Sequence, residues 1–154
     1  MGITGNKKRL RGSYIVKVDD GGRIKIPEEF RNIIETNYGK EVFVTSLNGE
    51  YVQVYPVKIW EKIEERIFNA PSTNPSVVKF IERTSYYGKT TQIDPKGRIL
   101  IHPLLRQKSQ LNGEVIILGS QNSLRIWNKT IFEKRRMEEP ITIEDLKVLS
   151  EFGI

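Results

Sequence analysis

Val18-Asp19-Asp20-Gly21-Gly22-Arg23-Ile24-Lys25-Ile26-Pro27 is matched later in the chain by Ile93-Asp94-Pro95-Lys96-Gly97-Arg98-Ile99-Leu100-Ile101-His102-Pro103. The aspartates of the two copies, Asp19 and Asp94, lie 75 residues apart. Each copy contains an apolar residue, an aspartate, a turn with glycine, an arginine and then alternating apolar residues that run into proline. This pattern indicates an internal duplication.

The duplication extends beyond these two stretches. Phe30-Arg31 is matched by Leu105-Arg106 at the same spacing, and Trp60-Glu61-Lys62 is matched by Phe132-Glu133-Lys134 at a slightly shorter one. Both halves therefore share one supersecondary plan. A unit of roughly 45 residues buries too little apolar surface to be stable alone. We therefore expect the two units to share one core, so that the chain is its own pseudo-dimer.

The first copy predicts a hairpin followed by a helix. Residues 14–18 are β-branched and read as a strand, and residues 19–22 form a turn whose glycines allow positive φ. Residues 23–26 alternate exposed basic with buried apolar side chains, so we expect cations on one face of the hairpin. Pro27 ends the strand, and residues 28–34 open a short helix with acids in its first turn.

The remaining elements follow from turn and helix signals. Asn48-Gly49 between two apolar runs predicts a second hairpin. The residues Ile59, Ile63 and Ile67, with Trp60, form an apolar stripe at helical spacing that we expect in the core.

Two further helix starts are visible. Residues 71–75 read as a linker, with Asn74 as the N-cap of a helix through residues 77–81. Thr142 and Asp145 form a capping arrangement before Leu146 and Leu149, which predicts a short terminal helix.

The chain is basic, with 25 Lys and Arg against 19 Asp and Glu and a net charge of +6. The start carries Lys7, Lys8, Arg9 and Arg11, while residues 137–154 are acidic, and these two ends cancel. The excess positive charge therefore lies on the duplicated part, which favours an anionic partner such as nucleic acid. The basic start has a second interpretation, a disordered solubilising tail.

Several classes of protein are disfavoured. The chain has no cysteine and one histidine, which removes disulfide scaffolds, thiolate zinc sites and thiol nucleophiles. It also lacks a phosphate-binding loop and a dinucleotide-binding fingerprint. We expect no enzyme activity, cofactor, metal or small-molecule substrate, and His102 reads as a partly buried histidine at a strand end. No apolar run approaches the length of a membrane span, so we expect a cytoplasmic protein without membrane contact.

The duplicated acids and arginines have two interpretations. Arg23 and Arg98 follow Asp19 and Asp94 by four residues, close enough across a tight turn for a structural ion pair. An aspartate can equally hold the planar guanidinium in place for contact with a phosphate or a guanine edge. Acid–base chemistry by the two aspartates is a third possibility, but their duplicated place in a turn favours hairpin geometry.

The sequence Asp-x-x-Gly-Arg-Ile-x-Ile-Pro after a short strand is similar to the swapped-hairpin DNA-binding modules of the AbrB class. The whole chain from Arg11 to Ile154 resembles the MraZ family. The resemblance rests on the two copies together with these segments: Arg11-Gly12-Ser13-Tyr14, Tyr86-Tyr87-Gly88, Pro103-Leu104-Leu105-Arg106 and Leu146-Lys147-Val148-Leu149-Ser150-Glu151. Residues 1–10 lie outside the family pattern, and His102 replaces the first of two prolines usual there.

The resemblance implies an α+β fold, mainly β with short helices, built as a duplicated AbrB-like swapped-hairpin β-barrel. We expect the following division of the chain: a basic N-terminal arm at residues 1–12, a first SpoVT-AbrB repeat at 13–58, a helical connection at 59–87, a second repeat at 88–131 and a helical tail at 132–154.

The resemblance also implies a bacterial transcriptional regulator associated with the nucleoid. Such a protein binds short tandem repeats of double-stranded DNA upstream of cell-wall and division genes and assembles into a ring of protomers. The family signature assigns DNA contact to Arg23 and Arg98, with Asp19 and Asp94 orienting them. Lys17, Lys25 and Lys96 flank the signature as expected phosphate contacts. The alternatives are an AbrB-fold antitoxin and a ring-forming assembly protein that does not bind DNA.

Overall fold

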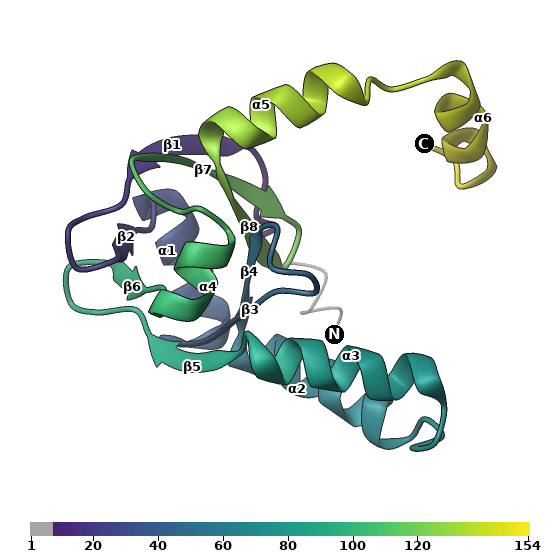
Figure 1. The fold of residues 1–154 in the computed structure, drawn as a ribbon, viewed down its shortest axis with the longest axis horizontal. Helices are drawn as coiled ribbons and strands as arrows, with labels where there is room; N and C mark the ends of the chain where they lie inside the picture. Colours follow the sequence, from purple (N-terminus) through teal and green to yellow (C-terminus); the bar gives the residue numbers. More distant parts are fainter. Residues whose placement is uncertain (1–7) are drawn as a thin grey trace.

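The structure is a computed structural model that describes residues 8–154. It is built from antiparallel strands and short helices (Figure 1). The first repeat comprises β1 (Ser13–Lys17), β2 (Arg23–Lys25), α1 (Glu28–Tyr38), β3 (Glu41–Thr45) and β4 (Val52–Pro56). The second comprises β5 (Lys89–Gln92), β6 (Arg98–Leu100), α4 (Pro103–Lys108), β7 (Glu114–Ser120) and β8 (Ser123–Asn128). A helical hairpin of α2 (Val57–Phe68) and α3 (Pro75–Tyr86) joins the repeats, and α5 (Lys129–Glu138) and α6 (Ile143–Glu151) form the tail.

The strands of the two repeats are exchanged. Six strands form one sheet in the order β1-β7-β8-β4-β3-β5, and β2 pairs with β6 in a separate two-stranded sheet. Replacing each strand by its counterpart in the other repeat gives the same order read backwards. The duplication in the sequence is therefore a pseudo-twofold axis in the fold, which confirms the predicted swapped-hairpin pseudo-dimer.

The exchange corrects one local prediction. Residues 14–26 do not form a hairpin paired with itself, because β1 pairs with β7 and β2 pairs with β6 of the other repeat. The six-stranded sheet ends at the edge strands β1 and β5, which lie near β2 and β6 respectively. The barrel is thus open rather than closed by a continuous ladder.

The centre of the fold is the pair Ile24 and Ile99, which lie opposite each other in the β2–β6 ladder and are almost wholly buried. The ladder is extended on both sides by equivalent bonds between the repeats. The backbone N–H of Ile26 donates to the carbonyl of Gly97 at 2.8 Å, and that of Ile101 donates to the carbonyl of Gly22 at 3.0 Å. Each repeat therefore completes the core of the other.

The predicted turn and helix signals are confirmed in three places. β3 and β4 pair around Asn48-Gly49. The side chain of Asn74 caps α3 by accepting from the backbone N–H of Ser76 at 2.9 Å. Thr142 and Asp145 form a reciprocal capping box at the start of α6.

The apolar stripe of α2 is only partly in the core. Ile59 and Trp60 are buried, as predicted. Ile63 and Ile67 are only half-buried, so the prediction is wrong for them. The reason is that α2 and α3 project from the sheet as a pair. Much of their surface is therefore covered neither by the sheet nor by the C-terminal tail (Figure 1).

The end of the predicted basic arm is tied into the fold. Lys7 lies outside the described residues, but Leu10 is buried, with 1% of its surface exposed. Leu10 and Gln121 exchange two backbone hydrogen bonds, of 2.7 and 2.9 Å. These hydrogen bonds attach residue 10 to the second repeat, between β7 and β8.

Leu10→Ala should therefore destabilise the protein by about 2–5 kcal/mol, because it removes a fully buried side chain and leaves a cavity. Leu47→Ala is the matched control, since Leu47 is 39% exposed. Urea unfolding at one fixed protein concentration measures both. Equal losses of stability in the two variants would show that Leu10 does not belong to the core.

Candidate nucleic-acid interface

The β2–β6 ladder and its two turns form a surface that we call the hairpin ridge, residues 19–25 and 94–100. Strand alternation sends Ile24 and Ile99 inward and leaves the neighbouring side chains outward. Arg23 and Lys25 are exposed and Arg98 is half-buried. Lys25 stands directly opposite Arg98 in the ladder, so two cations face each other across the strands.

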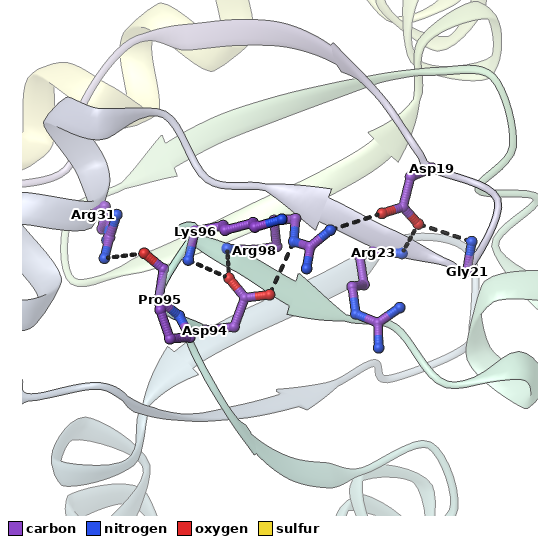
Figure 2. A network of polar contacts seen from close by, with 8 residues as sticks. All are labelled: Asp19, Gly21, Arg23, Arg31, Asp94, Pro95, Lys96 and Arg98. Atoms are coloured by element: carbon purple, nitrogen blue, oxygen red, sulfur yellow. Dashed lines mark hydrogen bonds and ion pairs between the residues drawn. The ribbon is translucent and has the colours of Figure 1, made fainter.

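Both turns are held by their aspartates in the same way. The carboxylate of Asp19 accepts hydrogen bonds from the backbone N–H groups of Gly21 and Arg23, both at 2.9 Å. Asp94 accepts from the N–H groups of Lys96 and Arg98, at 2.9 and 2.8 Å (Figure 2). The repeated aspartate is therefore a turn-forming residue in each copy.

The two arginines differ. The Nε of Arg98 donates to Asp94 at 2.9 Å, and its Nη1 lies 3.6 Å from Asp19 of the other repeat (Figure 2). The guanidinium of Arg23 has no hydrogen bond or ion pair to any residue in the described range 8–154. It lies against Gly21, where a Cβ would stand 2.7 Å from its Nη1. Asp19 thus makes its hydrogen bond to Arg23 only through the backbone, and its carboxylate forms an ion pair with the side chain of Arg98 instead.

Both aspartates have a pKa below the ordinary value for this side chain. The backbone N–H of Arg23 lowers the pKa of Asp19, with further help from Gly21 and the nearby arginines. The backbone N–H of Arg98 lowers the pKa of Asp94, and the Arg98 guanidinium adds to the effect. Both carboxyls are ionised at neutral pH and have no proton to donate there, which argues against a general-acid role.

Two arginines that sequence reasoning left without a role hold the turns from outside. Arg106 of α4 lies against Gly22 of the first repeat, so closely that a Cβ on Gly22 would overlap its guanidinium, and it donates to the carbonyl of Ile101 at 2.9 Å. Arg31 of α1 lies against Gly97 of the second repeat and donates to the carbonyl of Pro95 at 3.4 Å. Their equal spacing in the two copies was the available signal. Each helix thus supports the turn of the other repeat.

Cations gather at one end of the hairpin ridge. Lys25, Arg31 and Lys96 line a hollow of about 290 Å³, together with Ile26, Glu28 and Asn32. The counterparts of the two lysines in the other copy are Leu100 and Gly21. The pseudo-twofold axis of the backbone therefore does not extend to the charges.

Lys17 lies apart from this hollow, at the end of β1, where it is exposed and opposite Glu114 of β7. The structure thus brings Lys25 and Lys96 together and places Lys17 on another edge.

His102 lies at the start of α4 and is partly buried. Burial lowers its pKa, as do the positive charges of Lys89 and Arg106. Neither ring nitrogen has a hydrogen-bond partner within the described residues. Among residues 8–154, no group of three or more acidic, histidine or cysteine side chains is placed to hold a metal. None of the helices in that range is long and apolar enough to cross a membrane.

The depressed pKa of Asp94 predicts a pH effect on stability. Its folded pKa lies below the ordinary value of 3.8, so the stabilisation is present above pH 3.8 and is lost as the pH falls through the folded pKa. Asp94→Asn should lower the free energy of unfolding at pH 7. It should also flatten the decline of that free energy as the pH falls below 3.8. The urea midpoint between pH 7 and pH 3 measures this. Asp20→Asn, which removes one carboxylate from the other turn of the ridge, is the charge-matched control. A profile for Asp94→Asn parallel to wild type would contradict the assignment.

The sequence is similar to that of known proteins. Residues 10–80 and 88–142 match the family described as "MraZ protein, putative antitoxin-like". A relative from Acidobacterium capsulatum, named transcriptional regulator MraZ, is 37% identical over 145 residues, which cover 94% of this chain and 99% of the relative. A relative of the same name from Koribacter versatilis is 36% identical, over 94% of this chain and 99% of the relative. One from Escherichia coli is 32% identical, over 89% of this chain and 90% of the relative. The break between the two matched segments, residues 81–87, falls in the second half of α3 and ends just before β5, where the second repeat begins. In sequence and in the arrangement of its repeats, the chain therefore belongs to the MraZ family.

Proposed function

We propose that this protein is a transcriptional regulator that binds double-stranded DNA in a sequence-specific manner through the hairpin ridge. The observation that carries the proposal is the state of Arg23. It is the exposed arginine of the duplicated signature, and its guanidinium has no partner among the described residues. A guanidinium without an internal partner is available to an external anion or base edge.

The chemistry of the ridge suits DNA. A planar guanidinium makes two parallel hydrogen bonds to a guanine edge or to a phosphate. Lys25 and Lys96, with Lys17 further off, are placed to neutralise backbone phosphates, because DNA affinity depends largely on such contacts. We assign Arg98 a positioning role in addition to any DNA contact, because it joins Asp94 to Asp19 and so fixes the two turns relative to each other.

A single ridge with a few cations binds weakly in salt. If protomers assemble into a ring, equivalent ridges stand at regular intervals, and successive operator repeats are bound at high effective concentration. We therefore propose that the protein self-associates and binds short tandem repeats upstream of cell-wall and division genes. The site of action is then the cytoplasm, on the nucleoid.

The antitoxin-like description of the family supports a second candidate, toxin neutralisation. An antitoxin of this fold is expected to have a single copy of the hairpin and a disordered segment that binds the toxin. This chain instead carries two copies, and its tail forms capped helices. A protein that assembles without binding DNA is the third candidate. Sequence-specific DNA binding would exclude the third candidate, and its absence would exclude the first.

Arg23→Ala should lower affinity for the protein's own upstream DNA by about 1–3 kcal/mol, concentrated at one operator position if the arginine reads a base. Fluorescence anisotropy with operator variants measures this. The unfolding midpoint should stay at the wild-type value, because the guanidinium of Arg23 has no internal partner. Arg98→Ala should instead lower that midpoint, because two carboxylates lose their partner. Unchanged DNA affinity in Arg23→Ala would refute the proposed site.

The lysines should act through phosphates. The Lys25→Ala/Lys96→Ala variant should weaken binding to all sequences alike and reduce the slope of log affinity against log salt by about 0.9 for each phosphate that the variant no longer neutralises. Lys58→Ala on α2 is the control, since Lys58 is exposed but lies outside the ridge. An equal change of slope in the control would show that the lysines act only through overall charge.

A further inference from the structure

Two apolar surfaces have no role in the DNA-binding proposal: a cleft in the α2–α3 hairpin and one side of α6. We propose that α6 of one protomer docks into the α2–α3 cleft of a second copy of this chain. The inference deepens the proposed self-association by naming the two surfaces that meet.

The cleft lies between α2, α3 and β3 and has a volume of about 680 Å³. Its lining is mainly apolar and includes Phe43, Trp60, Ile67, Val77 and Ile81. Phe68 stands at its rim with 87% of its surface exposed. An open apolar groove of this kind is the usual receptor for an amphipathic helix.

α6 has the complementary properties. Ile143, Leu146 and Leu149 follow one another at a spacing of three residues and so lie on one side of the helix. Ile143 is 73% exposed, Leu146 is 56% exposed, and no residue of α6 is buried. Phe152 and Ile154, just after the helix, are also exposed. The capping box at Thr142 forms the helix before it meets any partner, so docking orders little new chain.

The positions of the two surfaces favour a partner copy. α5 packs on β7 and β8, whereas α2 packs on β3 and β4 towards the other edge of the sheet. Figure 1 shows α6 standing clear of the body at the end of α5, separated from the helical hairpin although both extend from the same side of the sheet. A groove and a helix that lie on different surfaces of one protomer give a head-to-tail contact between copies, which closes into a ring when the rotation permits.

Charge complementarity supports the same occupant. Residues 137–154 contain five acids and one lysine, in a chain with a net charge of +6. Lys79 and Arg83 of α3 line a smaller hollow, of about 230 Å³, with Leu47 and Phe80. Glu144 in the exposed first turn of α6 is suited to these cations, and docking would exchange its ion pair with Lys147 for them. Glu64 is the acidic residue in the lining of the cleft, and Lys147 of α6 can form an ion pair with it.

Cysteine cross-linking tests the proposal directly, because the chain has no native cysteine. Full-length Ile81→Cys and Leu146→Cys proteins are mixed under mild oxidation without DNA. Dimers are then counted on a non-reducing gel. We expect a disulfide-linked dimer several-fold more abundant than in the control mixture of Ile81→Cys with Val148→Cys. Val148 is 52% exposed but lies two residues from Leu146, about 200° around the helix.

Two results would overturn the docking. One is a yield no higher than that of the Val148 control, as expected if a different protein fills the cleft. The other concerns a protein that carries both Ile81→Cys and Leu146→Cys: it would form the disulfide only within one chain and never between two chains.

A second readout does not depend on cross-linking. Ile81→Ser should reduce the assembled mass in light scattering, whereas Val78→Ser should not. Both residues are on α3 and similarly exposed, at 41% and 39%, but Val78 does not line the cleft. If docking fails while Arg23-dependent DNA binding persists, only this inference is overturned. If docking is observed while Arg23→Ala leaves DNA binding unchanged, only the DNA proposal is overturned.

Discussion

Ile24 and Ile99 meet in the middle of the β2–β6 ladder, and neither can be buried by its own repeat. Each of these strands is three residues long and supplies one inward side chain. In an isolated repeat, the central isoleucine of that strand would therefore stay in contact with water. Burial requires the counterpart strand from the other half of the chain. The exchanged pairing of β1 with β7 and of β5 with β3 follows from the same requirement. The shared core thus places both turns of the hairpin ridge on one outer surface.

The common backbone carries unequal side chains. In the second copy Arg98 is held by two carboxylates, whereas in the first copy Arg23 is held by none. Lys25 faces Arg98 across the ladder, an arrangement that repels unless counter-charges are near. Asp94 and Asp19 supply those charges to Arg98, whereas the side chains of Arg23, Lys25 and Lys96 on the ridge have no hydrogen bond or ion pair to another described residue. A dimer of identical chains would have to place the same residue at both ends of the ridge. A fused pair can assign one arginine to structure and the other to a ligand.

Much of the fold could be predicted from the sequence, because the signals involved are local or repeated. The duplicated signature, the Asn74 cap and the Thr142–Asp145 capping box each depend on residues a few positions apart. Strand partners could not be derived from one copy, because a hairpin closed on itself and a hairpin exchanged with its repeat have the same alternation. Only the family resemblance favoured exchange. The half-burial of Ile63 and Ile67 depends on how far the helical hairpin projects from the sheet, which helical periodicity does not report.

The candidate site was predictable as a set of residues but not as a set of contacts. The spacing brought Asp19 and Arg23 together as a candidate pair, whereas the structure joins the Asp19 side chain to Arg98 across the pseudo-twofold axis. Arg31 and Arg106 were visible as a repeated pair, but their packing against the glycines of the opposite turns depends on the exchange of strands.

Joining both repeats in one polypeptide also removes mass action from the formation of the shared core. A two-chain version of this fold would dissociate and unfold on dilution, since its stability would depend on protomer concentration. Here the partner repeat is always present at the effective concentration set by the α2–α3 connection. The hairpin ridge therefore stays formed even when a cell contains only a few copies of the chain.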